Sequence, residues 1–216
     1  MRRCLLALLL VWQTGALEAP VRRRLTVGQS CFWSPQETLS NLPGVEGCTA
    51  GYLGLDNSVE STPPTYSSVC AGDGRVEAVT LTFDDKVITF ERLLQQYLQY
   101  WRSLPSLPPK GSQYSPCLIV ETEDELALAK AAMSEEELAI HTVALRSAST
   151  AFWAAEGYHQ QYESKQRPRN LMLVAGLGTS FVGDTTAHQI GSVLLAAYCA
   201  LNLGERLLGD KVKRVF

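Results

Sequence analysis

The order of hydrophobic and polar positions along the chain predicts short strands intermixed with amphipathic helices. Alternating apolar and polar residues are typical of a half-buried strand, whereas apolar residues three and four positions apart indicate a helix. Strands are expected at residues 25–28, 45–52, 77–83, 115–120 and 139–146. Helices are expected at residues 34–40, 90–101, 123–137, 150–165 and 190–208. Because these elements do not alternate as regular β-α-β units, the pattern predicts an α+β sandwich.

Turn-forming residues separate these elements. The stretches 41–44 and 71–75 are short turns built from Asn, Asp, Gly and Pro. A long polar loop is expected at 53–66 and a proline-rich loop at 104–111. Thr89 can cap the helix that follows it, which is the most clearly amphipathic one in the chain.

The first residues have the features of a targeting segment that is removed. Arg2 and Arg3 precede a short apolar run, and the small residues near Ala16 suit a cleavage site. The run is too short to cross a bilayer, which takes about 20 apolar residues. We therefore expect a signal peptide at 1–19 that directs the protein to the secretory pathway, the ER or the exterior. A transit peptide into a plastid or mitochondrion is the alternative, because no acidic residue precedes Glu18.

After this leader, a catalytic domain is expected at 25–166 and a C-terminal extension at 167–216. The extension contains the candidate amphipathic helix 190–208, whose unbroken apolar part is too short to span a membrane. We expect this helix to pack on the domain or on a partner. Contact with a membrane surface, supported by the basic residues that follow the helix, is the alternative.

Composition and charge exclude some classes of function. The 216 residues are 46% hydrophobic and 19% charged, as in a soluble globular protein, and the net charge is −3. An acidic balance gives no electrostatic reason to expect nucleic acid as a partner. The three histidines are far apart, and no His/Cys spacing resembles a zinc site, so no metal is expected. We expect a monomer.

Six cysteines are present, at positions 4, 31, 48, 70, 117 and 199. Removal of the leader leaves an odd number, so at least one thiol is unpaired within the chain. Cys31 is the most interesting, because it lies where a strand leads into a helix. Unpaired backbone N–H groups and the helix dipole at such a position favour the nucleophilic thiolate. The next two residues, Phe32 and Trp33, can wall an apolar pocket beside the sulfur.

Motifs around Cys31 and further along the chain resemble the A-type peptide methionine sulfoxide reductases. They include Cys-Phe-Trp at 31–33, Gly-Tyr-x-Gly at 51–54, Pro-Thr-Tyr at 64–66, Val-Glu-Ala-Val at 76–79, Gly-Ser-Gln-Tyr at 111–114 and the run from Phe152 to Tyr162. Their order and spacing are similar to the family's from about residue 25 to 165. The resemblance implies a two-layer sandwich of a mixed sheet and flanking helices with a ferredoxin-like core, followed here by an extra C-terminal helix.

The resemblance also implies a role for each site residue in reducing methionine-S-sulfoxide, free or in peptides, as a repair of oxidised proteins. Cys31 would attack the sulfoxide sulfur while Glu77 protonates the departing oxygen. Glu77 begins an otherwise apolar strand, where burial can keep it protonated. Tyr66 and Tyr114 match the hydroxyl groups that hold the oxygen, and Phe32 and Trp33 match the pocket for the methyl group.

Turnover would leave Cys31 as a sulfenic acid that needs a second thiol. No bound cofactor is expected. The reductant would be an external thiol such as thioredoxin, glutaredoxin or glutathione. Cys199 is a candidate resolving cysteine, although it falls in a predicted helix. Cys48, Cys70 and Cys117 are expected to be buried core cysteines.

Several positions depart from the family pattern. Ser30 replaces the usual glycine before the nucleophile, Gln36 replaces an acid, Arg75 replaces a histidine, and Pro109 stands where an active-site aspartate is usual. We expect weakened or altered activity from these changes. Two alternatives remain open: a catalytically impaired relative that binds oxidised methionine or a partner protein, and a thiol peroxidase or redox relay that uses Cys31.

Overall fold

The computed structural model describes residues 21–55, 62–105, 108, 111–147, 150–180, 185–208 and 213–215. The expected targeting peptide at 1–19 and the position of Pro109 lie outside these ranges. The strands are β1 (Arg22–Gly28), β2 (Val45–Gly54), β3 (Arg75–Asp84), β4 (Cys117–Val120), β5 (Thr142–Leu145), β6 (Ala151–Ala154) and β7 (Lys213–Arg214). The helices are α1 (Trp33–Ser40), α2 (Tyr66–Cys70), α3 (Phe90–Ser103), α4 (Glu123–Ala131), α5 (Glu135–Ile140), α6 (Tyr162–Ser180) and α7 (Thr185–Leu208).

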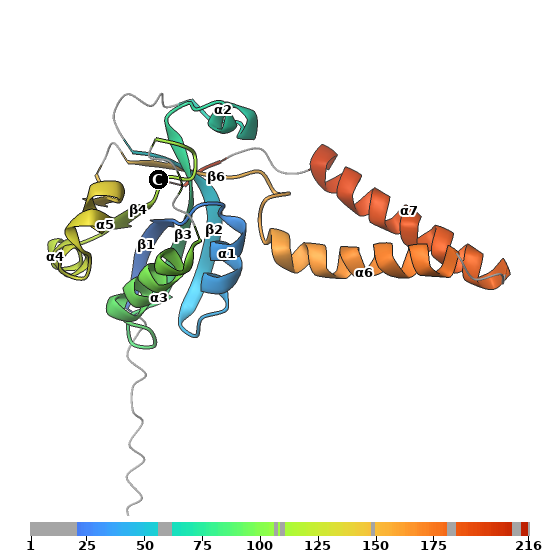
Figure 1. Ribbon diagram of the computed structural model, residues 1–216, viewed down its shortest axis with the longest axis horizontal. Coiled ribbons are helices and arrows are strands. Elements are labelled where there is room, and N and C mark those ends of the chain that lie inside the picture. Colours follow the sequence, from blue (N-terminus) through green and yellow to red (C-terminus); the bar gives the residue numbers. More distant parts are fainter. Residues whose placement is uncertain are drawn as a thin grey trace, which may run out of the picture.

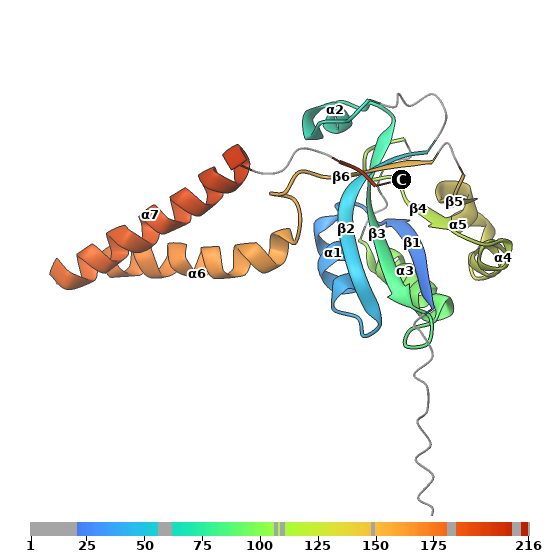
Figure 2. The ribbon, with the colours of Figure 1, turned by 180° about the vertical axis from the view of Figure 1, so that it is seen from behind.

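The strands form one mixed sheet in the order β5-β4-β1-β3-β2-β6-β7. All neighbouring pairs are antiparallel except β4 and β5, which are parallel. The four central strands, with α1 after β1 and α3 after β3, have the connectivity of a ferredoxin-like core. Figure 1 views the sheet from the side where α1 and α3 lie, and Figure 2 views it from behind. The expected α+β class and two-layer sandwich are therefore confirmed.

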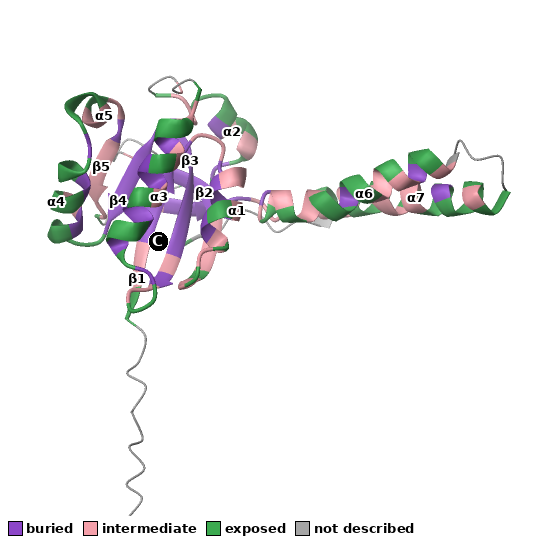
Figure 3. Ribbon diagram, turned by 60° about the horizontal axis from the view of Figure 1, so that its bottom comes forward, coloured by how far each residue is buried: buried purple, intermediate pink, exposed green. Residues whose placement is uncertain are grey.

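The main core lies between the sheet and these helices, where the strands are buried along most of their length (Figure 3). Along β3 the residues alternate between the two faces, as the pleat requires. Val79, Leu81 and Phe83 belong to the main core, while Val76 and Ala78 belong to a smaller core cluster. By this alternation Glu77 lies on the same face as Val79, which is the face that α1 and α3 cover.

Two expected helices are wrong in their bounds or their type. The helix expected at 123–137 is two helices, because Ser134 caps a new helix and accepts a hydrogen bond from the Glu137 backbone N–H. The strand expected from 139 begins only at Thr142. The helix expected at 150–165 begins with a strand instead, because β6 pairs with β2 and buries its two central residues. The loop expected up to residue 66 ends in the short helix α2, which was not expected.

The C-terminal part is a hairpin of two helices rather than a single helix. Helices α6 and α7 run beside each other and project away from the sheet, and the chain then returns to add β7 beside β6 (Figure 1). Most of the large apolar side chains that are exposed in the described ranges lie on this hairpin. None of the helices that the structure describes has the length and apolar character needed to cross a bilayer.

Candidate active site

Cys31 lies in the turn between β1 and α1, two residues before the helix begins. Ser30 has a φ of +69°, which is the left-handed region that favours glycine. At Gly28 an added Cβ would lie 2.7 Å from the Cys117 sulfur, so only glycine lets β1 and β4 approach this closely. The turn therefore holds Cys31 half-buried in a fixed, slightly strained backbone.

Glu77 is the residue that the fold brings to Cys31. Its side chain is 1% exposed, and the carboxyl group accepts a hydrogen bond of 3.1 Å from the Phe32 backbone N–H. The Gln113 side-chain amide donates to the other oxygen at 3.3 Å, and the Glu77 N–H donates to the Gln113 carbonyl at 2.7 Å. Glu77 also acts electrostatically on the Cys31 thiol, and the N–H that it accepts belongs to the residue next to Cys31. The predicted nucleophile and acid are therefore neighbours in the site.

The surroundings change the protonation of both groups. Burial raises the pKa of Glu77 to about 7, although the hydrogen bond from the Phe32 N–H and the nearby Cys31 thiol act in the opposite direction. Burial and the nearby Glu77 raise the pKa of Cys31 to about 11, and the Trp33 backbone N–H only partly offsets this. The helix end therefore favours the thiolate, as expected, but burial and Glu77 outweigh it. At neutral pH the pair is a thiol beside a carboxyl group that is poised to gain or lose a proton.

Tyr66 is the first residue of α2 and Tyr114 lies in the turn before β4, and both lie within electrostatic range of this pair. Burial raises the pKa of both phenols, and the charge of Glu77 contributes in both cases. The side chain of Thr65 caps α2, and the Glu156 carboxylate accepts the Tyr66 backbone N–H at 3.1 Å. Tyr52 donates to the other oxygen of Glu156 at 2.7 Å. The backbone of Tyr66 is thus fixed to β2 and to the turn after β6.

Phe32 and Trp33 belong to an aromatic cluster around His159. The Trp33 indole N–H donates to His159 Nδ1 at 3.2 Å, and the Tyr66 and Phe32 rings lie 4.6 and 5.2 Å from the histidine ring. Burial lowers the pKa of His159 to about 4, so the ring is neutral, with its proton on Nε2. Trp33 also stacks on Tyr162 with centroids 3.8 Å apart. Phe32 is buried and Trp33 half-buried, so the expected apolar wall is present beside Cys31.

Sequence reasoning missed the residues that hold these parts together. Gln36 is 1% exposed and donates to the Cys48 carbonyl and to the Gln160 side chain, while its own oxygen accepts the Gln161 N–H at 2.7 Å. Glu156 and Gln113 have comparable positioning roles. In the sequence, only the motif run 152–162 pointed to these interactions. The partners of Gln36, which are Gln160 and Gln161, lie more than a hundred residues after α1.

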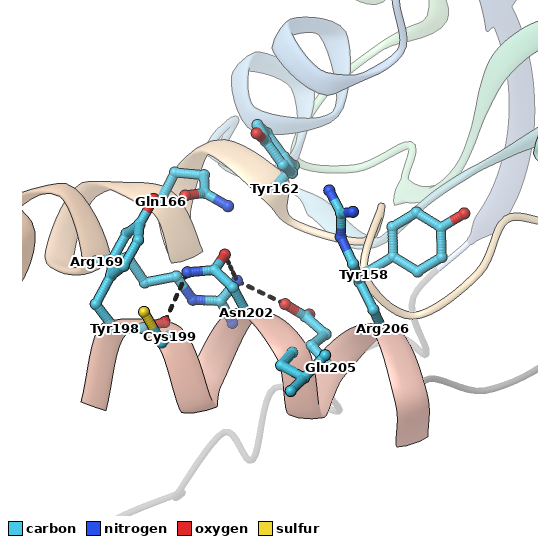
Figure 4. Close-up of a pocket in the computed structure, with 10 residues that line it drawn as sticks. Tyr158, Tyr162, Gln166, Arg169, Tyr198, Cys199, Asn202, Glu205 and Arg206 are labelled. Carbon is cyan, nitrogen blue, oxygen red and sulfur yellow. Dashed lines mark hydrogen bonds and ion pairs between the residues drawn. The ribbon is translucent and has the colours of Figure 1, made fainter. Parts of the chain in front are cut away.

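The other cysteines in the described ranges are free thiols, and none of them forms a disulfide with Cys31. Cys117 is buried, Cys48 half-buried, and Cys70 exposed, so the expectation of a core position is wrong for Cys70. Cys70 ends α2 and interacts with the Tyr66 hydroxyl. Cys199 lines a cavity of about 460 Å³ between the two helices of the hairpin, with Tyr198, Arg169 and Asn202 (Figure 4). The structure does not place Cys199 with Cys31, and its resolving role stays a prediction.

The described ranges contain no cluster of three side chains suited to a metal ion.

The comparisons with known proteins agree on one family. The family model described as "Peptide methionine sulfoxide reductase" matches residues 23–187. Over 155 residues the chain is 32% identical to the "Peptide methionine sulfoxide reductase MsrA/MsrB" of Vibrio cholerae, which covers 68% of the chain and only 40% of that relative. It is 34% identical over 155 residues to the "Peptide methionine sulfoxide reductase MsrA" of Methanoculleus marisnigri, covering 66% of the chain and 90% of the relative. The fold is similar to the solved methionine sulfoxide reductase A of Corynebacterium diphtheriae, with a TM-score of 0.56, 19% identity, and coverage of 69% of this chain and 77% of that one.

Proposed function

The chain belongs to the peptide methionine sulfoxide reductase family, and we propose that it reduces methionine-S-sulfoxide to methionine with Cys31 as nucleophile and Glu77 as acid. The observation that carries this proposal is the buried Glu77 carboxyl, which accepts the Phe32 N–H beside Cys31, acts electrostatically on the Cys31 thiol and has its pKa raised to about 7. Burial beside a thiol does not stabilise a carboxylate, so a purely structural role does not explain this position of Glu77. A general acid that works at neutral pH, in contrast, needs a pKa near 7.

The proposed step transfers one oxygen atom. The Cys31 sulfur attacks the sulfoxide sulfur while Glu77 gives its proton to the sulfoxide oxygen, and the carboxylate that forms takes up the thiol proton. The attack forms a transient bond between the two sulfur atoms. This bond and the S–O bond of the sulfoxide then break as the protonated oxygen is transferred to the Cys31 sulfur, so the substrate leaves as a sulfide and Cys31 becomes a sulfenic acid. The raised pKa of Cys31 fits this order of events, because the thiol proton has an acceptor only after Glu77 has donated.

The neighbouring side chains support the same reaction. Tyr66 and Tyr114 are hydroxyl donors within electrostatic range of Glu77, where they can stabilise the oxygen that is being protonated. Phe32 and Trp33 provide the apolar surface for the methyl group of the substrate. Stereochemical preference for the S epimer is part of the proposal, since one fixed oxygen site and one fixed methyl site admit a single configuration.

Return of Cys31 to the thiol requires two electrons from outside the site. We propose an external thiol reductant of the thioredoxin, glutaredoxin or glutathione class, because every described cysteine is a free thiol and none forms a disulfide with Cys31. A secretory destination remains part of the proposal. It is tested by expressing the chain with a C-terminal fluorescent tag, with and without residues 1–19, and comparing where the two forms accumulate.

The function is tested with the chain lacking residues 1–19, a methionine-S-sulfoxide substrate and dithiothreitol. Methionine should form with the unmutated protein, and Cys31→Ser should abolish its formation. Glu77→Gln should lower turnover about 10²- to 10⁴-fold, the usual contribution of a general acid. Cys199→Ser, which removes an exposed thiol on α7, serves as the matched control in this dithiothreitol-driven assay. Absence of turnover by the unmutated protein would contradict the enzymatic function and support a protein that only binds oxidised methionine.

A further inference from the structure

A cavity lies beside the aromatic wall of the proposed site. It has a volume of about 420 Å³ and is lined by Trp33, Tyr66, Tyr158, His159, Tyr162 and Arg206. Trp33 and Tyr66 are shared with the proposed reaction site, whereas Arg206 comes from the C-terminal end of α7. The hairpin therefore contributes a cationic side chain to a cavity whose other walls are aromatic.

The position of Arg206 is set by ion pairs on its neighbour in the sequence. Glu205 binds Lys165 and also binds Arg169 at 2.6 Å, and these contacts fix the end of α7 to the beginning of α6. In Figure 4 the Arg206 side chain extends from α7 toward Tyr158 and Tyr162. The positive charge of Arg206 acts to lower the pKa of both Tyr158 and His159. The Arg206 guanidinium therefore reaches the cavity from a backbone position that these ion pairs hold in place.

The carboxyl groups around the cavity do not neutralise Arg206. Glu205 is engaged by Lys165 and Arg169, and Glu156 accepts hydrogen bonds from Tyr52 and Tyr66. Glu163 acts on Cys31 but is not among the residues that line the cavity. No residue in the described ranges forms an ion pair with Arg206, which is exposed to solvent.

We propose that Arg206 binds a carboxylate on the substrate and so makes the protein prefer methionine sulfoxide with a free carboxyl group. This inference rests on the proposed function, because it places the substrate side chain between Cys31 and the cavity. In methionine sulfoxide the carboxylate lies at the opposite end from the sulfoxide, and the cavity joins Arg206 to Trp33 and Tyr66 of the proposed site. A guanidinium is suited to this role, since its planar donors match both oxygens of a carboxylate.

Two substrates carry this chemistry: free methionine sulfoxide, and a peptide that ends in methionine sulfoxide. Both present a carboxylate next to the oxidised side chain, whereas an internal residue of a protein presents an amide. The C-terminal peptide and the free amino acid differ only in the group on the nitrogen. The preference between them is therefore measured separately from the preference for a carboxylate.

The test measures binding in the full chain after leader removal with Cys31→Ser, which cannot turn over. N-acetyl-methionine-S-sulfoxide and its N-methylamide are titrated, and tryptophan fluorescence, to which Trp33 in the cavity contributes, gives both Kd values. The carboxylate should bind about tenfold more tightly, in keeping with a hydrogen-bonded charge pair. Arg206→Gln should reduce this ratio to about one, and Arg206→Lys should retain part of it. Arg92→Gln on α3, an exposed arginine away from the cavity, is the control and should leave the ratio unchanged. Free methionine-S-sulfoxide and a short peptide ending in methionine-S-sulfoxide are then compared in the same way.

Three outcomes overturn the inference: equal Kd values for the carboxylate and the amide, a ratio that Arg206→Gln does not change, or no binding of either ligand. Far-ultraviolet circular dichroism checks that the variants keep the hairpin, and the lysine variant separates loss of charge from loss of structure. Failure of the proposed function is a different result, namely no methionine produced by the protein with Cys31 intact. A carboxylate preference without turnover would therefore support this inference and contradict the enzymatic role.

Discussion

Replacing Glu77 with glutamine tests the electrostatics of the site apart from its activity. The carboxyl group is buried, and its pKa rises from 4.5 to about 7 in the folded chain. A folded-state pKa above the unfolded one means that the contribution of the group to stability is complete below pH 4.5 and is lost as the pH rises through 7. A difference of that size corresponds to roughly 3 kcal/mol of unfolding free energy. A glutamine side chain has nearly the same volume as glutamate, keeps an oxygen for the Phe32 N–H, and does not titrate.

Urea unfolding of both proteins at several pH values from 4 to 9 measures this effect. The unfolding free energy of Glu77→Gln minus that of the unmutated protein should rise by about 3 kcal/mol between pH 4 and pH 8. Other titrating groups are the same in both proteins and cancel in the difference. Glu123→Gln, at an exposed position on α4, is the control for removing a surface carboxyl group. Parallel stability curves for Glu77→Gln and the unmutated protein would refute the argument that Glu77 is protonated by its surroundings.

Three further predictions follow from the same geometry. If the protonated form of Glu77 is the reactive one, the single-turnover rate of methionine formation should be level below about pH 7 and fall about tenfold per pH unit above it; a rate that rises toward pH 9 would instead indicate a thiolate-limited reaction. Ser30→Gly should raise the unfolding free energy by about 0.5–1 kcal/mol, because it relieves a left-handed serine; urea unfolding checks this, and a loss of stability would contradict it. Glu156→Ala should cost about 2–3 kcal/mol of stability and reduce turnover, because Tyr52 and the Tyr66 N–H lose their acceptor; Glu156→Gln should recover most of the stability, and equal losses in both variants would show that the hydrogen bonds are not the cause.

Patterns that are local in the sequence predicted much of this structure. The alternation of residues in β3 and the apolar face of α3 were sufficient to predict these two elements, because each element has its own periodicity in the sequence. The same alternation places Glu77 on the core face with Val79 and Leu81, so its burial followed from the sequence. The resemblance to known motifs then joined Glu77 to Cys31 and to the two tyrosines.

The errors arose where distant contacts decide the structure. Ala151–Ala154 has residues that suit a helix, but its pairing with β2 makes it a strand. The role of Gln36 depends on Gln160 and Gln161, and that of Glu156 on Tyr52, and no local pattern carries these pairings. The pKa of Cys31 was misjudged for a related reason, because the helix end is local, whereas burial and Glu77 are contributions of the whole fold.

The most direct test of the central claim is a single turnover without reductant. The fully reduced chain, freed of residues 1–19, is mixed with methionine-S-sulfoxide, trapped with a sulfenic acid reagent, and analysed by peptide mass spectrometry. We expect about one equivalent of methionine per chain, one adduct of the sulfenic acid reagent on Cys31, and no reaction with the R epimer or with Cys31→Ser. Methionine formation that persists in Cys31→Ser, or an adduct found on Cys70 or Cys199 while Cys31 stays a thiol, would contradict the central claim.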